Sequence, residues 1–135
     1  MQDITLILAV TKASDYNRFS SLIKDHSIAE ETRQNIKDIG IYFDETKEEE
    51  IEWDEFRTWF FHKQHHSMKK DRQDIYTRVF NKIEKKAEEE DNPVVQAVIE
   101  HYIKLDYATR VADISLRIAE GDEKRSLAEV SDLLD

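Results

Sequence analysis

One segment, residues 92–121, constrains the fold of this chain more than any other. It begins with Asn-Pro, ends with Gly, and carries apolar side chains at helical spacing throughout: NPVVQAVIEHYIKLDYATRVADISLRIAEG. Asn is a favoured N-cap, Pro suits the first helical turn, and Gly commonly follows the last helical residue. The segment therefore predicts one helix over 93–120, which at 1.5 Å per residue is about 42 Å long.

The apolar side chains of this helix fall into two stripes on opposite sides when residues are placed at intervals of about 100°. One stripe consists of Val98, Tyr102, Leu105, Thr109, Ala112 and Leu116, and the other of Ile99, Ile103, Tyr107, Val111, Ile114 and Ile118. A surface helix needs only one apolar stripe. The second must be covered either by another chain or by further elements of the same chain, which would make this a buried core helix.

The residues that follow predict a short return helix. Ser126 and Glu129 in SLAE form a capping box, and apolar residues continue at helical spacing up to Leu134. An antiparallel return helix can cover only one stripe. We assign to packing within this hairpin Leu105, Ala112, Leu116, Leu127, Val130 and Leu134, and to an oligomer interface Ile99, Ile103, Tyr107, Val111, Ile114 and Ile118. A charge at Ile114 is then expected to separate subunits, and a charge at Leu116 to loosen the hairpin.

Composition favours helices in the rest of the chain as well. Two Gly and one Pro in 135 residues leave few tight turns, which predicts an all-α fold. We expect a globular helical head of four to five helices over 1–90, followed by a protruding antiparallel hairpin over 91–135, with a long helix at 93–120 and a return helix at 126–135. The expected head helices cover 4–10, 15–24, the stretch opened by the Ser27–Glu30 capping box, the aromatic WDEFRTWFFH, and 71–86, with an acidic loop from Asp44 to Glu52. Gly40 predicts the close approach of a neighbouring helix or a weak helix end.

Charge and composition argue against several classes of function. The formal net charge is -10, so we expect no tight binding of nucleic acid by this segment, because such binding draws on Lys and Arg. Neither Gly40 nor Gly121 lies in a P-loop pattern, there is no cysteine, and no apolar run is long enough to span a bilayer. We therefore expect no catalytic residue, no metal and no cofactor in this segment, no membrane association, and a cytoplasmic location.

The strip His62–Arg72, HKQHHSMKKDR, is locally basic in this acidic chain. Its histidines, His62, His65 and His66, lack a recognisable fourth ligand, so a solvated stretch is favoured over a zinc site. A contact of the strip with a nucleic-acid backbone or an acidic partner stays open, and ordinary polar surface is the simpler interpretation.

The order of these elements resembles the N-terminal domain of DnaB-type replicative DNA helicases, in the divergent form that bacteriophages encode. The stretch YIKLDYATRVADISLRIAEGDEKRSLAEVSDLLD resembles the helical hairpin of that family, in which a long helix turns at Gly into a Ser- or Thr-capped, Leu-rich helix. The stretch AEETRQNIKDIGIYFDE resembles its third helix. The similarity extends over nearly the whole chain and is one of pattern, and the acidic loop is longer than is typical of the family.

The resemblance implies a function in DNA replication. In that family the long helix packs on its own return helix on one side and on the hairpin of a neighbouring subunit on the other. The resemblance thus implies a homo-oligomer, a dimer of the hairpin and a hexamer of the full-length protein, with docking of a primase or a helicase loader. A motor domain that binds ATP and Mg would follow Asp135, where the helical pattern is still running. The alternative is a free-standing acidic all-helical phage regulator that binds a host protein.

Overall fold

The computed structural model describes residues 2–23, 28–89 and 92–134, and over these residues the chain is all-α, as its composition predicts. The helices are α1 (Gln2–Ala9), α2 (Ala13–Phe19), α3 (Glu30–Thr46), α4 (Trp53–Trp59), α5 (Lys70–Ala87), α6 (Pro93–Glu120) and α7 (Leu127–Leu134). A 3-10 turn, Ser20–Leu22, continues α2, and a π-helical turn, Phe60–Gln64, continues α4. The described part contains no strand, only one isolated antiparallel bridge between Lys12 and Glu50.

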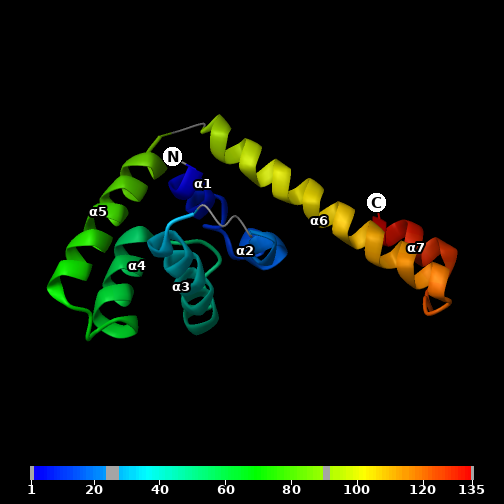
Figure 1. Cartoon of the computed structure of the whole chain (residues 1–135), viewed down its shortest axis with the longest axis horizontal. Helices are drawn as coiled ribbons and strands as arrows, with labels where there is room; N and C mark the ends of the chain where they lie inside the picture. Colours follow the sequence, from blue (N-terminus) through cyan, green and yellow to red (C-terminus); the bar gives the residue numbers. More distant parts are fainter. Residues whose placement is uncertain (1, 24–27, 90–91, 135) are drawn as a thin grey trace.

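The molecule consists of a head and an arm (Figure 1). We call α1 to α5 with the first half of α6 the head, and the second half of α6 with α7 the arm. In the head, α1 lies against α3, α5 and α6. Its segment ITLILAV is apolar almost all round, which is the pattern of a helix buried on every side, and Ile7 and Val10 are fully buried.

A cluster of aromatic side chains from α3, α4 and α5 forms a second part of the head core, beside the apolar residues of α1. Phe56 and Phe60 project from the α4 region and are fully buried. Their rings meet Phe80 of α5 edge to face, with centroids 5.9 and 5.0 Å apart. Tyr42 of α3 lies edge-on to Phe56 at 5.3 Å. Edge-to-face packing is one of the two preferred arrangements of aromatic rings, and this cluster holds α3, α4 and α5 against one another.

The beginning of α3 differs from the expectation. Ser27 of the expected capping box lies outside the described residues, and Glu30 is the first residue of the helix, too early to act as the third residue of a box. The cap comes instead from α1. The Asp3 carboxylate accepts hydrogen bonds from the backbone N–H of Ala29, at 2.9 Å, and from the hydroxyl of Thr32, at 2.7 Å. A cap supplied from another helix leaves no signal in the local sequence.

The middle of α3 confirms the close approach predicted for Gly40. A Cβ atom added at Gly40 would clash with the ring and hydroxyl of Tyr16 on α2. The helix also continues to Thr46 and ends at Lys47, which has a positive φ of 60°. The expected loop from Asp44 to Glu52 is therefore shorter, because its first three residues are helical.

Candidate oligomerisation surface on α6 and α7

Local signals fix both ends of α6 at the predicted residues. The side chain of Asn92 accepts a hydrogen bond from the backbone N–H of Val95 at 3.3 Å, and Pro93 is the first helical residue. At the other end Gly121 adopts a φ of 74°. The N–H of Asp122 donates to the carbonyl of Arg117 at 2.9 Å, and that of Gly121 to Ile118 at 3.2 Å, which is the Schellman pattern of helix termination.

The first half of α6 packs on the head. Val95 is buried, and Tyr102 stacks on Phe19 of α2 with ring centroids 5.5 Å apart and planes 13° apart. The half-buried residues that pack against the head core come from both stripes: Val98 and Tyr102 from one, Ile99 and Ile103 from the other. The head therefore lies on the side of the helix between the stripes.

Asp106 marks the place where α6 leaves the head. Only 9% of the surface of Asp106 is exposed to solvent. Its carboxylate accepts a bond from Nε of Arg18 on α2 at 2.9 Å and forms an ion pair with Arg110 one turn later at 3.1 Å. Beyond it, the same side of the helix carries Asp113 and Arg117, which pair with each other at 3.2 Å. The head-facing side of α6 thus changes from apolar to charged at Asp106.

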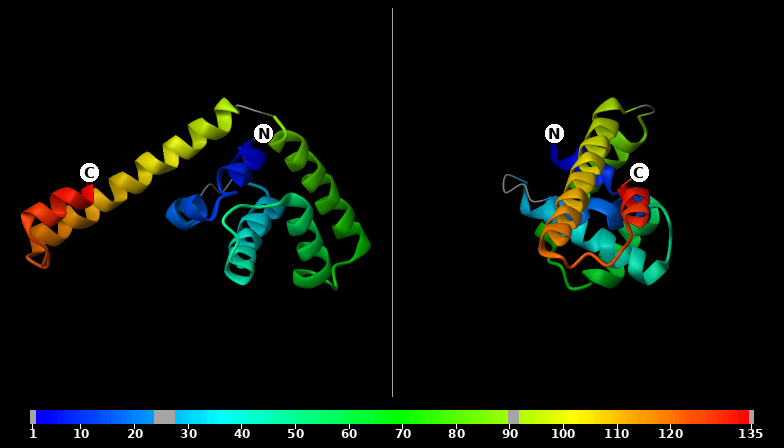
Figure 2. Two further views of the ribbon diagram at one scale, coloured as in Figure 1. Left: turned by 180° about the vertical axis from the view of Figure 1, so that it is seen from behind. Right: turned by 90° about the vertical axis from the view of Figure 1, so that its right-hand side faces the viewer.

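In the arm, α7 lies beside the end of α6 (Figure 2). The buried apolar residues there are Ile114, 4% exposed, and Val130, 6% exposed. The N-cap half of the expected capping box is present, since the hydroxyl of Ser126 accepts a hydrogen bond from the backbone N–H of Glu129 at 3.2 Å. The same hydroxyl donates to the Glu129 carboxylate at 3.2 Å. In the turn, Arg125 holds both carboxylate oxygens of Glu123, at 2.7 and 2.9 Å. These hydrogen bonds lower the pKa of Glu123 to about 2.

In the arm, the burial of Ile114 and Leu116 is the opposite of what was expected from the two stripes. Ile114, assigned to the oligomer interface, is buried within the hairpin, and Val111 is half-buried. Leu116, assigned to hairpin packing, is 57% exposed, and Leu105 and Ala112 are exposed as well. The physical reason is that a helical wheel gives the angle between two stripes but not the side on which the turn delivers the next helix.

Of the other residues assigned to the oligomer interface or to hairpin packing, some pack on the head and some are exposed to solvent. Ile99 and Ile103 pack on the head, whereas Tyr107 and Ile118 of the assigned interface are exposed. On α7, Leu127 is exposed although it was assigned to hairpin packing, and Val130 is buried as expected. The side chain of Leu134 lies outside what the structure describes.

Exposed apolar side chains concentrate on these two helices. Over the residues that the structure describes, every large hydrophobic residue with an exposed side chain belongs to α6 or α7: Val94, Leu105, Tyr107, Leu116, Ile118, Leu127 and Leu133. We call the side of the arm that carries Leu105, Thr109, Ala112 and Leu116 the open face. An exposed apolar face of this kind is typical of a protein–protein interface.

One residue of the basic strip, His65, takes part in a buried polar contact. Nε2 of His65 lies 2.7 Å from a carboxylate oxygen of Asp38, which is fully buried on α3, and Gln34 and Gln64 donate to the same carboxylate. His62 and His66 are exposed. Among the residues searched, no group of three or more His, Cys, Asp or Glu side chains could hold a metal ion, and no helix is long and apolar enough to cross a membrane.

Comparisons of the chain with protein-family models, with curated proteins and with solved structures found no match.

Proposed function

We propose that this chain is an assembly module, in which two or more copies associate through the open face of the arm. The observation that carries the proposal is the exposure of Leu105 and Leu116 on this face, two of the seven large apolar residues that are exposed on α6 and α7 in the described part of the chain. Fully burying an exposed leucine contributes about 1.5–3 kcal/mol before the entropic costs of association. Leu105 and Leu116 are 38% and 57% exposed, so each gains only part of this on association. Left in water, the same residues promote non-specific aggregation.

The charge balance of the second half of α6 favours a second copy of the chain as the occupant of this face. The chain as a whole has a formal net charge of -10, so two copies repel each other through most of their surface. Residues 105–119 are an exception, because they contain two acids, Asp106 and Asp113, and two bases, Arg110 and Arg117. These charges pair within the chain, so two such segments can approach without net repulsion.

The assembly that best accommodates these features is the N-terminal oligomerisation and partner-docking domain of a DnaB-type replicative helicase. Its support is the resemblance of the sequence pattern together with a helical head that carries a protruding arm. In this proposal the arms pair, the full-length protein forms a hexamer, the head is available to a primase or loader, and an ATPase domain with its ATP and Mg follows Asp135. The alternative, a free-standing regulator, does not require the arms to pair.

Sedimentation at several protein concentrations tests the assembly. We expect the wild-type chain to form an oligomer and Leu116→Glu to sediment as a monomer with unchanged helix content. Ser115→Glu is the matched control, since it adds the same charge to the next exposed position, off the open face. A wild-type chain that stays monomeric at all concentrations, or equal dissociation by the two variants, contradicts the proposal.

The helicase assignment has its own test. It requires that the reading frame encoding the chain continue beyond Asp135 into a P-loop, G-x-x-x-x-G-K-[ST]. A stop codon directly after Asp135 contradicts that assignment and favours the free-standing regulator.

A further inference from the structure

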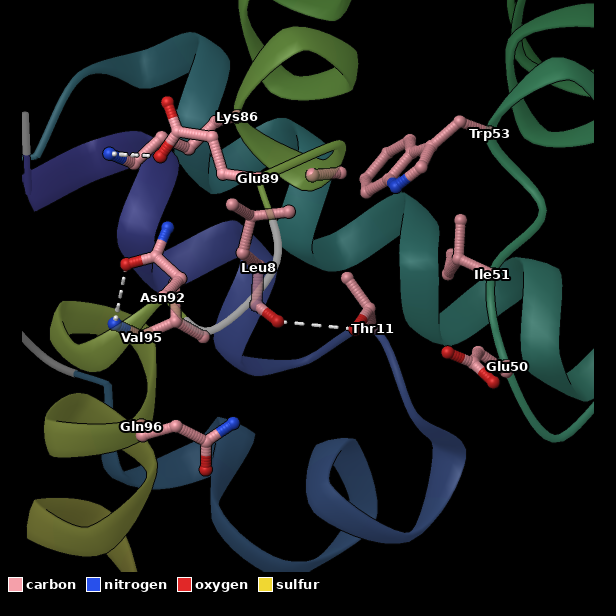
Figure 3. Close-up of a pocket in the computed structure, with 11 residues that line it drawn as sticks. Leu8, Thr11, Glu50, Ile51, Trp53, Lys86, Glu89, Asn92, Val95 and Gln96 are labelled. Atoms are coloured by element: carbon pink, nitrogen blue, oxygen red, sulfur yellow. Dashed lines mark hydrogen bonds and ion pairs between the residues drawn. The ribbon is translucent and has the colours of Figure 1, made fainter.

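A groove on the head lies away from the open face of the arm. It is a hollow of about 500 Å³ where α1, the end of α5 and the start of α6 meet the loop before α4. Its apolar lining includes Leu8, Ile51, Trp53, Ala87 and Val95. Figure 3 shows the indole of Trp53 and the side chain of Leu8 pointing into this space from opposite sides.

The groove extends past Trp53 into a second hollow. This one has a volume of about 330 Å³ and shares Ile51, Trp53 and Ala87 with the first. The lining of the two hollows is mixed, with polar side chains around Trp53, Ile51 and Ala87. A large aromatic side chain between two such hollows can receive apolar side chains of a partner, while the polar groups around it meet its polar or charged side chains.

The rim of the groove is strongly acidic. Among the lining residues that the structure describes, the acids are Glu50, Glu52, Asp54, Glu84, Glu88 and Glu89, and the one base is Lys86. Two of the acids have partners, since Glu84 pairs with Arg57 at 3.4 Å and Glu89 with Lys86 at 3.1 Å. Glu50, Asp54 and Glu88 form no ion pair within the described part of the chain.

The acidic rim favours a positively charged binding partner. Like charges that line one groove repel one another, and a cation placed between them relieves that repulsion. The face of a tryptophan ring also attracts Lys and Arg side chains. The rim would repel an acidic segment, and a second copy of this acidic chain fits it poorly.

We propose that this groove binds a segment of another protein in which apolar side chains are flanked by lysine or arginine. The apolar side chains enter the space beside Trp53, and the basic side chains face Glu50 and Glu88 on the rim. The inference does not depend on pairing of the arms, because the groove is built from residues of the head and the first turn of α6.

Fluorescence of Trp53 provides a direct readout. In a Trp59→Phe background Trp53 is the only tryptophan, and the probes are three peptides of equal length without tryptophan. They share the same leucines and carry lysine, glutamine or glutamate at the remaining positions. We expect the lysine peptide to shift Trp53 emission and to bind about tenfold more tightly than the glutamine peptide, and the glutamate peptide not to bind.

Charge reversals on the rim separate a site from a general attraction to an acidic protein. The double variant Glu50→Lys/Glu88→Lys should weaken binding of the lysine peptide about tenfold. The control Asp44→Lys/Asp74→Lys changes the net charge equally at exposed positions of the head that line neither hollow, and should leave binding unchanged.

Three results overturn the inference: equal weakening by both double variants, equal binding of the glutamine and lysine peptides, or Trp53 emission that does not respond. Sedimentation identifies a further contrary outcome. If the rim variant abolishes self-association while Leu116→Glu does not, the occupant of the groove is a second copy. The proposal for the groove and the proposal for the arm can therefore be contradicted independently of each other.

Discussion

Asp106 is the residue that joins the arm to the head. Burying a carboxylate is costly unless it is paired, and here Arg18 of α2 and Arg110 of α6 both pair with it. The Arg18 bond connects residues 88 positions apart in the sequence. It holds α6 on α2 at the point where apolar packing ends, so it contributes to the direction in which the arm leaves the head.

Removing Arg18 should therefore destabilise the chain more than removing an ordinary surface base. We expect Arg18→Met to lower the free energy of unfolding by about 1–2 kcal/mol. This is less than the loss of a fully buried ion pair would cost, because the side chain of Arg18 is partly exposed to solvent. Lys104→Met, which breaks the exposed Glu100–Lys104 pair at 3.5 Å, should cost no more than about 0.5 kcal/mol. Unfolding of both variants and of the wild type in urea measures these free energies. Equal effects would show that the Arg18 bond stabilises no more than a surface pair does.

Gly40 is a second position where one atom decides the packing of two helices. We expect Gly40→Ala to destabilise the fold by about 1–3 kcal/mol, although alanine favours helices, because the new methyl group meets the Tyr16 ring. In a Tyr16→Ala background the same substitution should cost less or stabilise. A cost that is unchanged in that background would contradict the clash with Tyr16.

Among the elements, the turn between α6 and α7 determines which face of the arm is covered. Gly121 ends α6 with a left-handed backbone, Glu123 and Arg125 pair within the turn, and Ser126 opens α7. These local contacts deliver α7 onto the Ile114 side and leave Leu116 uncovered. The exposed face of the arm is thus a consequence of the geometry of a few turn residues.

The ion pair in this turn should show a pH dependence of definite sign. The folded pKa of Glu123, about 2, lies below its ordinary value of 4.5, so the pair stabilises the fold above about pH 4.5 and loses this effect as the pH falls towards 2. We expect the stability difference between wild type and Arg125→Met to be constant at neutral pH and to vanish near pH 2. NMR titration of the Glu123 carboxyl should give a midpoint near 2 in the wild type and an ordinary one in Arg125→Met. A midpoint near 4.5 in both would contradict the pairing.

At the scale of the whole molecule, the features that could be predicted from the sequence are those that depend on neighbouring residues or on composition. The bounds of α6 follow from Asn92, Pro93 and Gly121, and the all-α class follows from the scarcity of Gly and Pro. The cap on α3 could not be predicted, because Asp3 lies on another helix. For the same reason the groove, whose walls come from four separate segments, has no sequence signature. The change from apolar to charged residues at Asp106 was a signal that could have located the end of the head.

The head and the arm should unfold separately, since the second half of α6 packs on α7 while the aromatic cluster lies entirely in the head. Both tryptophans, Trp53 and Trp59, are in α4, so fluorescence reports the head and far-UV circular dichroism reports all helices. We expect Ile114→Glu to destabilise the arm by about 3–5 kcal/mol, because it places an unpaired charge in a buried position. At low protein concentration the dichroism should show an early loss of helix while the fluorescence transition stays in place.

Leu116→Glu is the control for this experiment, since it adds the same charge two residues away on the open face and should leave both transitions unchanged. The pair of variants also distinguishes the observed arrangement from its reverse, in which Leu116 would be the buried residue. If Leu116→Glu melts the arm and Ile114→Glu does not, α7 covers the other face. If Ile114→Glu shifts both transitions together, α6 transmits the disruption to the head, and the two parts unfold as one cooperative unit.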